Sequence, residues 1–294
     1  MYFRTKTIVK TLTAILMAMI IAVIPPFSVD SNAKGSKSST DFEEYTVVDI
    51  DETTVKIVDI DEDGDWGYTL KVSIENNSDD ITYMYSAESA SLNGVCVTPY
   101  LYTEVKPGKK TNEDLEFYLS EEEEELIGEV TDIFIVMHAY DSNDWSADDI
   151  FYEEFHIYPK GEDNAEIVER EDEDSDIILA ENDDIRLVLT GTEMDEYWGY
   201  ELKVYLLNDT DQNVVFTIDD ASINGYMIDC YWAEWLLPGT QALSDIDFYP
   251  EDLEDIDIED EDDIEQIEFT FRVYDADDYY ADDIYSEEIT IEID

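Results

Sequence analysis

Apolar and polar residues alternate along much of this chain with the two-residue period of β-strands. Between positions 66 and 74 the even positions hold Trp, Tyr, Leu, Val and Ile, and the odd positions are mainly polar. Positions 198 to 206 repeat the alternation with Trp, Tyr, Leu, Val and Leu. A strand of this kind packs its apolar face against a core and turns the other face to solvent. The pattern therefore predicts two equivalent strands, with Trp66 and Trp198 among the core residues.

Longer stretches of the chain also occur twice, as internal sequence repeats. Residues 66–76 and 198–208 are identical at 7 of 11 positions, and residues 140–150 and 274–284 also agree at 7 of 11. A repeat with so long a period indicates two complete domains, because solenoid units are much shorter. It also provides an internal alignment in which the recurrence of each conspicuous residue can be checked.

The two copies are expected to span residues 45–158 and 178–294, joined by an acidic linker at 159–177. About seven or eight short strands fit into each copy, which is the number typical of an immunoglobulin-like sandwich. The first copy also contains a capping box, Ser120 with Glu123, and the second has Pro250 at the start of a helical segment. The expected fold is therefore all-β, with two tandem immunoglobulin-like β-sandwiches that each carry one short helix.

The N-terminus has the features of a secretion signal. Three basic residues precede an apolar stretch at 11–25, which is short for a membrane span, and small residues follow at 31–33. We expect a signal peptide at 1–33 with cleavage after Ala33, a short spacer at 34–44, and a secreted, extracellular protein that does not associate with the membrane after cleavage. An uncleaved N-terminal anchor is the alternative.

The net charge of the chain limits the classes of partner that it can bind. Asp and Glu number 78 against 15 Lys and Arg, a formal net charge of -63, yet 44% of the residues are hydrophobic and 13% aromatic. The aromatic content is that of a folded protein, so the acids decorate a surface. Such a surface repels nucleic acid and anionic membranes. Cations are the expected partners: calcium, a basic protein or a cationic peptide.

One candidate calcium site lies at Asp59, Asp61 and Asp63. Acidic residues at alternate positions before Gly64 resemble the start of an EF-hand loop. The twelfth position of that loop is Leu70 in place of the bidentate Glu, and the second copy lacks the motif. An acidic β-hairpin is the alternative interpretation of this segment.

A second candidate is the loop between the last two strands of each copy, where acidic residues recur. They are Asp141, Asn143, Asp144, Asp148 and Asp149 in the first copy, and Asp275, Asp277, Asp278, Asp282 and Asp283 in the second. Several side-chain oxygens within nine residues can wrap a calcium ion, which would relieve their mutual repulsion. The alternative is a solvated loop with Asx turns.

Aromatic residues suggest a different ligand. Trp145 aligns with Tyr279 beside the acidic loops, and Trp235 has no aromatic counterpart in the first copy. Exposed aromatic rings beside carboxylates can stack on sugars, as on a carbohydrate-binding module, and partly buried packing at a strand edge is the alternative. A glycan is therefore a further candidate partner.

Catalysis finds little support in the sequence. His138 and His156 differ between the copies and fall on the polar sides of their strands, so we expect them to be exposed. Phosphate-binding and nucleophile-elbow motifs are absent from the sequence. Cys96 and Cys230 have no counterparts in the opposite copy, which favours free thiols over a disulfide. We expect the protein not to be an enzyme.

The strand and turn marks at 75–78 (Glu-Asn-Asn-Ser), 91–94 (Ser-Leu-Asn-Gly), 107–109 (Pro-Gly-Lys) and 134–141 resemble a known type of domain. It is the uncharacterised immunoglobulin-like domain found in tandem in secreted proteins and lipoproteins of Gram-positive bacteria. The resemblance implies a sandwich fold without an assigned chemistry. The expected function is that of a secreted, non-catalytic binding or adhesion protein associated with calcium; a carbohydrate-binding pair and a purely structural spacer are the alternatives.

Overall fold

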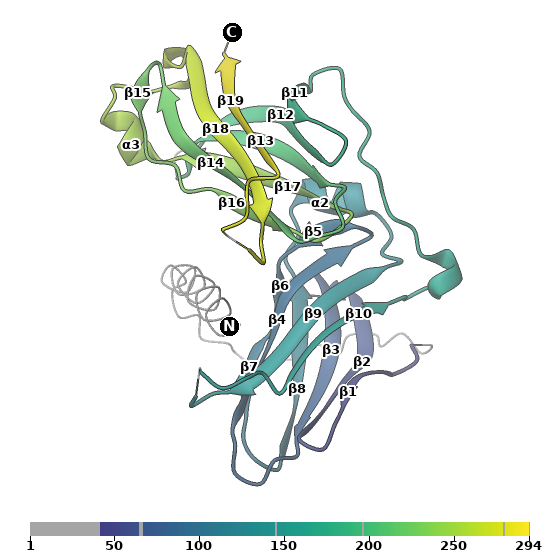
Figure 1. Cartoon of the computed structure of the whole chain (residues 1–294). Coiled ribbons are helices and arrows are strands. Elements are labelled where there is room, and N and C mark those ends of the chain that lie inside the picture. Colours follow the sequence, from purple (N-terminus) through teal and green to yellow (C-terminus); the bar gives the residue numbers. More distant parts are fainter. Residues whose placement is uncertain (1–41, 65–66, 145, 196, 279, 294) are drawn as a thin grey trace. The chain divides into compact units, whose positions relative to one another are not determined.

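The structure is a computed structural model that describes residues 42–64, 67–144, 146–195, 197–278 and 280–293. These residues form mainly antiparallel β-sheets and two short α-helices, α2 (Glu121–Ile127) and α3 (Pro250–Glu254), as Figure 1 shows. The predicted all-β sandwich class is confirmed, with one short helix in each copy. Neither of these helices has the length and hydropathy that a membrane span requires. The predicted signal peptide and most of the spacer lie outside the described residues.

The contacts of the chain divide it into two compact units that do not coincide with the two sequence copies. Of the described residues, the first unit contains those within 42–89, Thr98–Tyr118 and Ile135–Phe155, and the second contains those within Ala90–Val97, Leu119–Phe134 and 156–293. Segments of the first copy, including α2, thus belong to the second unit. The domain boundaries at 45–158 and 178–294 stay a prediction.

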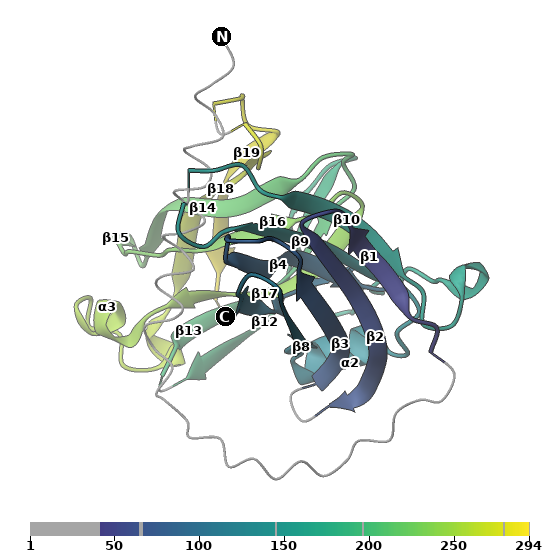
Figure 2. The ribbon, with the colours of Figure 1, turned by 90° about the horizontal axis from the view of Figure 1, so that it is seen from below.

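The first unit contains strands of two sheets, which can be followed in Figure 2. The first sheet has the order β1 (Tyr45–Asp49), β2 (Thr53–Gly64), β3 (Gly67–Asn76), β8 (Lys109–Phe117) and β6 (Pro99–Tyr100). The second contains β10 (Phe151–Ile157), β9 (Ile133–Asp141), β4 (Tyr83–Leu92) and β7 (Tyr102–Val105). On β3 the predicted inward residues Leu70, Val72 and Ile74 are fully buried, which confirms the alternation.

The second unit has an equivalent pair of sheets. One has the order β5 (Val95–Val97), β17 (Thr240–Phe248), β13 (Gly199–Asn208), β12 (Ile185–Asp195) and β11 (Ile177–Glu181). The other contains β15 (Tyr226–Met227), β14 (Val214–Ile223), β18 (Gln266–Asp275) and β19 (Tyr285–Glu292), and β16 (Ala233–Leu236) pairs with β14. Leu202, Val204 and Leu206 of β13 enter one core with Phe216 and Phe271 from the facing sheet.

The helix start predicted from Ser120 is present in the structure. Its hydroxyl accepts a hydrogen bond from the Glu123 amide at 3.1 Å, and its own amide donates to Glu123 Oε2 at 2.7 Å. Pro250 is the first residue of α3, as its fixed φ favours. The predicted linker is less independent than its composition indicates, because Gln241 Nε2 donates to the carbonyl of Val168 at 2.6 Å.

A buried Asn ends the same strand in both copies. The Asn76 side chain is fully buried; its Nδ2 donates to the carbonyls of Ile81 at 2.9 Å and Val105 at 2.7 Å. Its Oδ1 accepts from the amide and hydroxyl of Ser78. Asn208 repeats the arrangement, with donation from its Nδ2 to the carbonyls of Gln212, Leu236 and Leu237. The buried amide therefore fixes the turn that follows the strand.

Both cysteines are free thiols, as predicted. The Cys96 Sγ lies 3.0 Å from the Thr240 hydroxyl, and the Cys230 thiol donates to the backbone carbonyl of Asp247 at 3.5 Å. Burial raises the pKa of both thiols, so they behave as small packed side chains and are poor nucleophiles.

Candidate functional site

The recurring acidic loops form Asx turns. In the first copy Asp141 Oδ1 accepts the Asn143 amide at 2.9 Å, and Asp144 Oδ1 accepts the amide and hydroxyl of Ser146 at 3.1 and 2.6 Å. The second copy shows the same bonds from the Asp277 amide to Asp275 at 2.8 Å, and from the Tyr280 amide to Asp278 at 3.1 Å. The oxygens considered as calcium ligands thus already stabilise the loop backbone.

The last acid of each loop faces a side chain on the neighbouring strand. Arg272 on β18 makes two bonds to Asp283, at 2.9 and 2.8 Å, and a third to Asp219 at 2.8 Å. The hydrogen bonds from Arg272 lower the pKa of Asp283. In the first copy His138 Nδ1 lies 3.4 Å from Asp149 Oδ2. Asp149 and Asp283 therefore recur for a structural reason, because each one contacts a side chain on the neighbouring strand.

His138 is less exposed than its position in the sequence predicts. Its side chain is 21% exposed, and its Nε2 lies 2.7 Å from the hydroxyl of Ser86, which is itself buried. Ser86, His138 and Asp149 follow one another in the order of a hydrolase triad. Ser86 lies within the paired part of β4, however, so its amide belongs to the sheet, and its hydroxyl is closed to a substrate.

The other predicted metal ligands are distributed along exposed backbone. Asp148 and Asp282 are exposed residues of the two loops. Asp59 and Asp61 lie on β2 in register with Lys71 and Thr69 of β3, and Asp63 follows on the same strand, as the acidic-hairpin interpretation predicts. In the part of the chain that the structure describes, no group of three or more His, Cys, Asp or Glu side chains is arranged to hold a metal ion. Calcium association stays a prediction.

The aromatic candidates divide into three cases. Trp235 on β16 is 45% exposed, so a ring is accessible there. Trp145 and Tyr279 lie outside the described residues, and so does Trp66. Trp198 was predicted to lie in the core, and this prediction is wrong, because its side chain is 52% exposed.

The position of Trp198 follows from the backbone beside it. Strand β13 begins at Gly199, whose φ of +85° reverses the alternation of sides, so residue 198 does not continue the inward face. A Cβ at Gly199 would lie 2.0 Å from the Phe248 carbonyl oxygen, which restricts the position to glycine. The amide of Trp198 donates to Asp195 Oδ1 at 2.9 Å and holds the turn.

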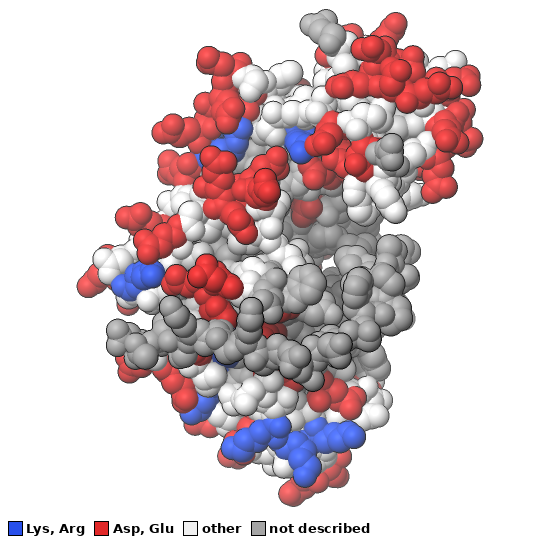
Figure 3. Space-filling model, turned by 180° about the vertical axis from the view of Figure 1, so that it is seen from behind, with Lys and Arg blue, Asp and Glu red and all other residues white. Residues whose placement is uncertain are grey.

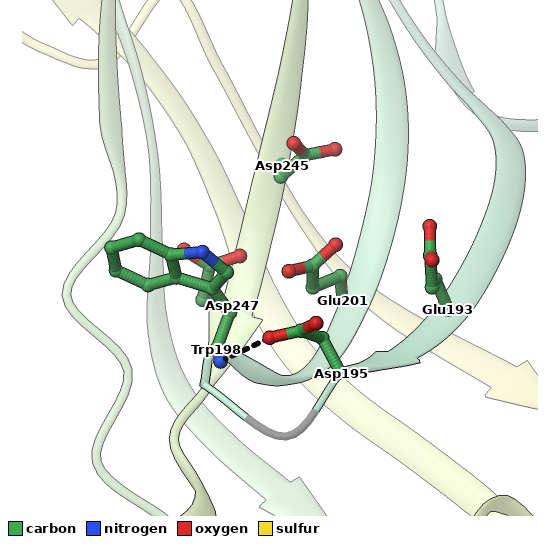
Figure 4. Close-up of a pocket in the computed structure, with 6 residues that line it drawn as sticks. All are labelled: Glu193, Asp195, Trp198, Glu201, Asp245 and Asp247. Carbon is green, nitrogen blue, oxygen red and sulfur yellow. Dashed lines mark hydrogen bonds between the residues drawn. The ribbon is translucent and has the colours of Figure 1, made fainter.

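The exposed indole borders an acidic pocket of about 380 Å³ within the second unit. Its lining consists of this one aromatic ring and carboxylates from three neighbouring strands (Figure 4). The lining residues are Glu193 and Asp195 of β12, Trp198, Glu201 of β13, and Asp245 and Asp247 of β17. We call this arrangement the acidic pocket.

The sheet register puts three of these carboxylates in one row. Glu201 on the central strand lies directly opposite Glu193 on one side and Asp247 on the other. Residues in direct cross-strand register have Cβ atoms about 4.5–5.5 Å apart, and like charges at that separation repel. In Figure 4 the Glu201 carboxylate points into the space between Asp195 and Asp247.

Burial adds to this repulsion. Glu201 is only 9% exposed, and among the described residues no hydrogen bond or ion pair reaches its carboxylate. Oδ1 of Asp247 is also buried and without a hydrogen-bond partner in the described chain. Burial and neighbouring acids raise the pKa of Glu201, and burial together with Asp245 raises the pKa of Asp247 to about 6. The pocket thus holds negative charge that the protein does not compensate.

One lysine lies beside the acidic pocket and is already engaged. Lys203 is opposite Asp245 in the sheet register, but its Nζ lies 2.9 Å from Glu193 and 3.6 Å from Glu122. It partly opposes the burial that raises the pKa of Asp245. None of the described basic side chains has such an effect on the pKa of Glu201 or Asp247.

The acidic pocket was not predicted from the sequence. Its central residue has no acidic counterpart in the first copy, where Thr69 stands, so a search for recurring acids passes over it. The sequence feature that could have identified the pocket is an acidic residue on the polar side of each of three strands that are neighbours in one sheet. That pattern becomes visible only when the strands are placed in register.

Comparisons with known proteins give little further information. No family model matches the chain, and no curated protein matches it. Among solved structures, red sea bream transglutaminase matches at 10% sequence identity over 71% of this chain, with a TM-score of 0.19. The match covers 27% of the transglutaminase chain, so this chain spans about a quarter of that protein's length. A TM-score of this size carries no argument about the protein.

One expectation from the sequence is not kept. We predicted that the chain is not an enzyme, and the solved structure that matches is that of an enzyme. The prediction is therefore withdrawn, and no reaction is assigned in its place.

Proposed function

We propose that this chain is a secreted binding or adhesion protein that recognises cationic partners, namely a basic protein or a cationic peptide. Secretion is inferred from the N-terminal sequence pattern. The observation that carries the proposal is the large surplus of acidic side chains on a folded β framework, 78 against 15 basic residues. In Figure 3 acidic side chains are spread over the visible face, with few basic side chains among them.

Internal ion pairs occupy most of the described basic residues and leave most acids uncompensated. The described pairs involve one acid or two for each base: Lys56–Glu44, Lys71–Asp114, Lys110–Glu75, Lys160–Glu129, Arg170–Asp176, Arg186–Asp172, Lys203–Glu193 and Arg272–Asp283. The remaining carboxylates produce a negative potential that attracts positively charged partners and accelerates their association. The same potential opposes binding to nucleic acids and anionic membranes.

The test compares two peptides of equal length with the mature chain, residues 34–294. One peptide is rich in lysine and serine, the other in glutamate and serine, and binding is followed by fluorescence anisotropy at increasing sodium chloride. We expect only the lysine peptide to bind, with an affinity that falls as salt rises. Absence of binding at low salt, or equal binding of both peptides, would contradict the proposal.

Calcium association is tested in the same experiment. Calcium chloride and sodium chloride are compared at equal ionic strength, both as competitors of the peptide and for their effect on the melting temperature. A saturable effect that only calcium produces would support the predicted ion sites in the loops, and Asp148→Asn with Asp282→Asn should then remove it. An effect that sodium chloride reproduces indicates charge screening alone.

A further inference from the structure

We infer that the acidic pocket is a binding site for a primary ammonium group, carried by a lysine side chain of a partner protein or by a free polyamine. This inference rests on the proposed function and adds to it a place and a chemical group. Three features of the pocket support it: the row of like charges, the largely buried Glu201 beside the unsatisfied Oδ1 of Asp247, and the exposed indole.

The row of carboxylates requires a compensating charge. Adjacent strands lie about 4.8 Å apart, so Glu201 has an acid directly on each side. Lys203 compensates Glu193, at 2.9 Å. The other pair of the row, Glu201 with Asp247, has no described basic partner. A cation placed between these two carboxylates would convert a repulsive contact into two attractive ones.

Glu201 is the second feature. An acidic residue that is nine-tenths buried normally has a hydrogen-bond donor or a counterion, because an unpaired charge in such a place is costly. Here the side chain is directed into the pocket without one, and the buried Oδ1 of Asp247 is also unsatisfied. Both carboxylates are hydrogen-bond acceptors when ionised. The ligand that complements them is therefore a positively charged hydrogen-bond donor.

An ammonium group fits this arrangement better than a metal ion. Calcium takes six to eight oxygens at about 2.3–2.6 Å, which requires tightly converging ligands. The pocket carboxylates are distributed over three strands, and no described cluster of acids has an ion-binding arrangement. An ammonium has three N–H donors that point in different directions, so it can reach acceptors on separate strands.

The exposed indole distinguishes the pocket from a plain acidic surface. Trp198 is 52% exposed although large apolar side chains are normally covered, and it borders the carboxylates in Figure 4. The face of a Trp ring attracts cations, most strongly where water is partly excluded. The methylene chain of a lysine or a polyamine can also pack on the ring. A pocket of about 380 Å³ accommodates such a chain.

An arginine guanidinium is a weaker candidate. Its planar fork is best matched by one carboxylate that accepts two parallel hydrogen bonds. The acids of the row come from three different strands, so their carboxylates approach the pocket from separate backbones. We therefore expect lysine compounds to bind more tightly than arginine compounds.

The experiment uses isothermal titration calorimetry with residues 34–294 and four small probes. N-acetyl-lysine methylamide and spermidine carry the ammonium, N-acetyl-arginine methylamide carries a guanidinium, and N-acetyl-norleucine methylamide is the uncharged control. We expect both amines to bind and the norleucine compound not to bind. Tighter binding of the lysine compound would indicate a partner protein, and tighter binding of spermidine would indicate a free polyamine.

Variants assign the binding to the pocket. Glu201→Gln and Trp198→Ala should each weaken amine binding, the former by roughly tenfold because a charged hydrogen-bond partner is lost. Glu116→Gln is the matched control, since it removes one acid from the equivalent face of the first copy. Equal weakening by Glu116→Gln, or no heat with either amine, would overturn the inference. Circular dichroism confirms that the variants fold.

The lysine-rich peptide separates this inference from the proposed function. If the amines fail to bind while the peptide still binds the mature chain, the pocket is not the site and the proposed function stands. If the peptide also fails, both are wrong. If the peptide and the amines bind, Glu201→Gln should weaken peptide binding only in part, because the remaining surface charge still attracts it.

Discussion

Strands β3 and β13 occupy the same place in their sheets, and one position on them differs in chemistry. Thr69 lies between Asp61 and Glu116 in direct cross-strand register. Its side chain is 2% exposed, and its hydroxyl donates to the Gly67 carbonyl at 3.0 Å. At the corresponding position Glu201 is 9% exposed, and no described hydrogen bond reaches its carboxylate. The first copy thus satisfies a buried polar group internally, and the second leaves it available for a ligand.

The lysine next to this position shows the same contrast. Lys71 pairs with Asp114 directly across the strands at 2.9 Å. In the second copy Lys203 is in register with Asp245 but bonds to Glu193 at 2.9 Å. Two domains with one framework therefore distribute charge differently on the same face. The framework fixes where side chains lie, and the proposed cation site has Glu201 on the central strand where the first copy has Thr69.

The shared framework is tested most strongly at the buried Asn residues. Asn76→Ala and Asn208→Ala each leave buried carbonyls without donors, so each should lower the free energy of unfolding by about 2–4 kcal/mol. Urea denaturation of residues 34–294 measures the loss. Similar losses in the two variants would support one framework, and a loss in only one of them would break the comparison.

The next largest effect is expected from making the first copy resemble the second. Thr69→Glu removes a hydrogen bond and buries a carboxylate between two acids, so it should destabilise the chain by about 2–3 kcal/mol at neutral pH. Thr69→Gln is the uncharged control of similar size. If both variants lose the same stability, size and not charge is responsible.

The reverse exchange should stabilise the chain slightly. Glu201→Thr removes one member of a repulsive row and should raise the free energy of unfolding by about 0.2–1 kcal/mol at low ionic strength. Added salt should reduce this gain because it screens the repulsion. Glu193→Gln is the comparison, since its acid is paired with Lys203 and its removal should bring no gain. A destabilised Glu201→Thr would show that the carboxylate has an unrecognised favourable contact.

Asp247 should make a pH-dependent contribution to stability. Its pKa in the folded chain is raised to about 6, above the unfolded value of about 3.9. The folded state therefore binds the proton more tightly, and the associated stability is present below pH 4 and is lost as pH rises through 6. Asp247→Asn should be more stable than the parent chain at pH 7, and the difference should vanish near pH 4. If the stability difference between the variant and the parent chain does not change with pH, it does not come from titration of Asp247.

The sequence predicted the framework well because the framework depends on local rules. Alternation placed Leu70 and Leu202 in the cores, and the capping pair of Ser120 and Glu123 begins a helix. The prediction failed at Trp198, where the left-handed backbone of Gly199 interrupts the alternation. A strand pattern read from the sequence does not show where the chain changes side.

The candidate site was much harder to predict, for two reasons. Recurrence between the copies identifies residues that both domains need for structure, such as Asp149 and Asp283, which pair with the adjacent strand. A search for residues that recur in both copies therefore misses a binding site that is present in only one of them. In addition, Glu201 and Asp247 are 46 positions apart in the numbering and meet only through the sheet register. In a chain with 78 acids, no pair of that separation is conspicuous.

The buried strand-end amides also restrict how the protein can be produced. Asn76-Asn77-Ser78 and Asn208-Asp209-Thr210 are acceptor sequences for N-linked glycosylation, yet both acceptor nitrogens are fully enclosed and donate to backbone carbonyls. In a eukaryotic secretory pathway a glycan attached before folding would occupy the space of these bonds. The sugar and the native turn are mutually exclusive, so each glycosylated chain would be trapped outside the native fold, and bacterial expression avoids this outcome.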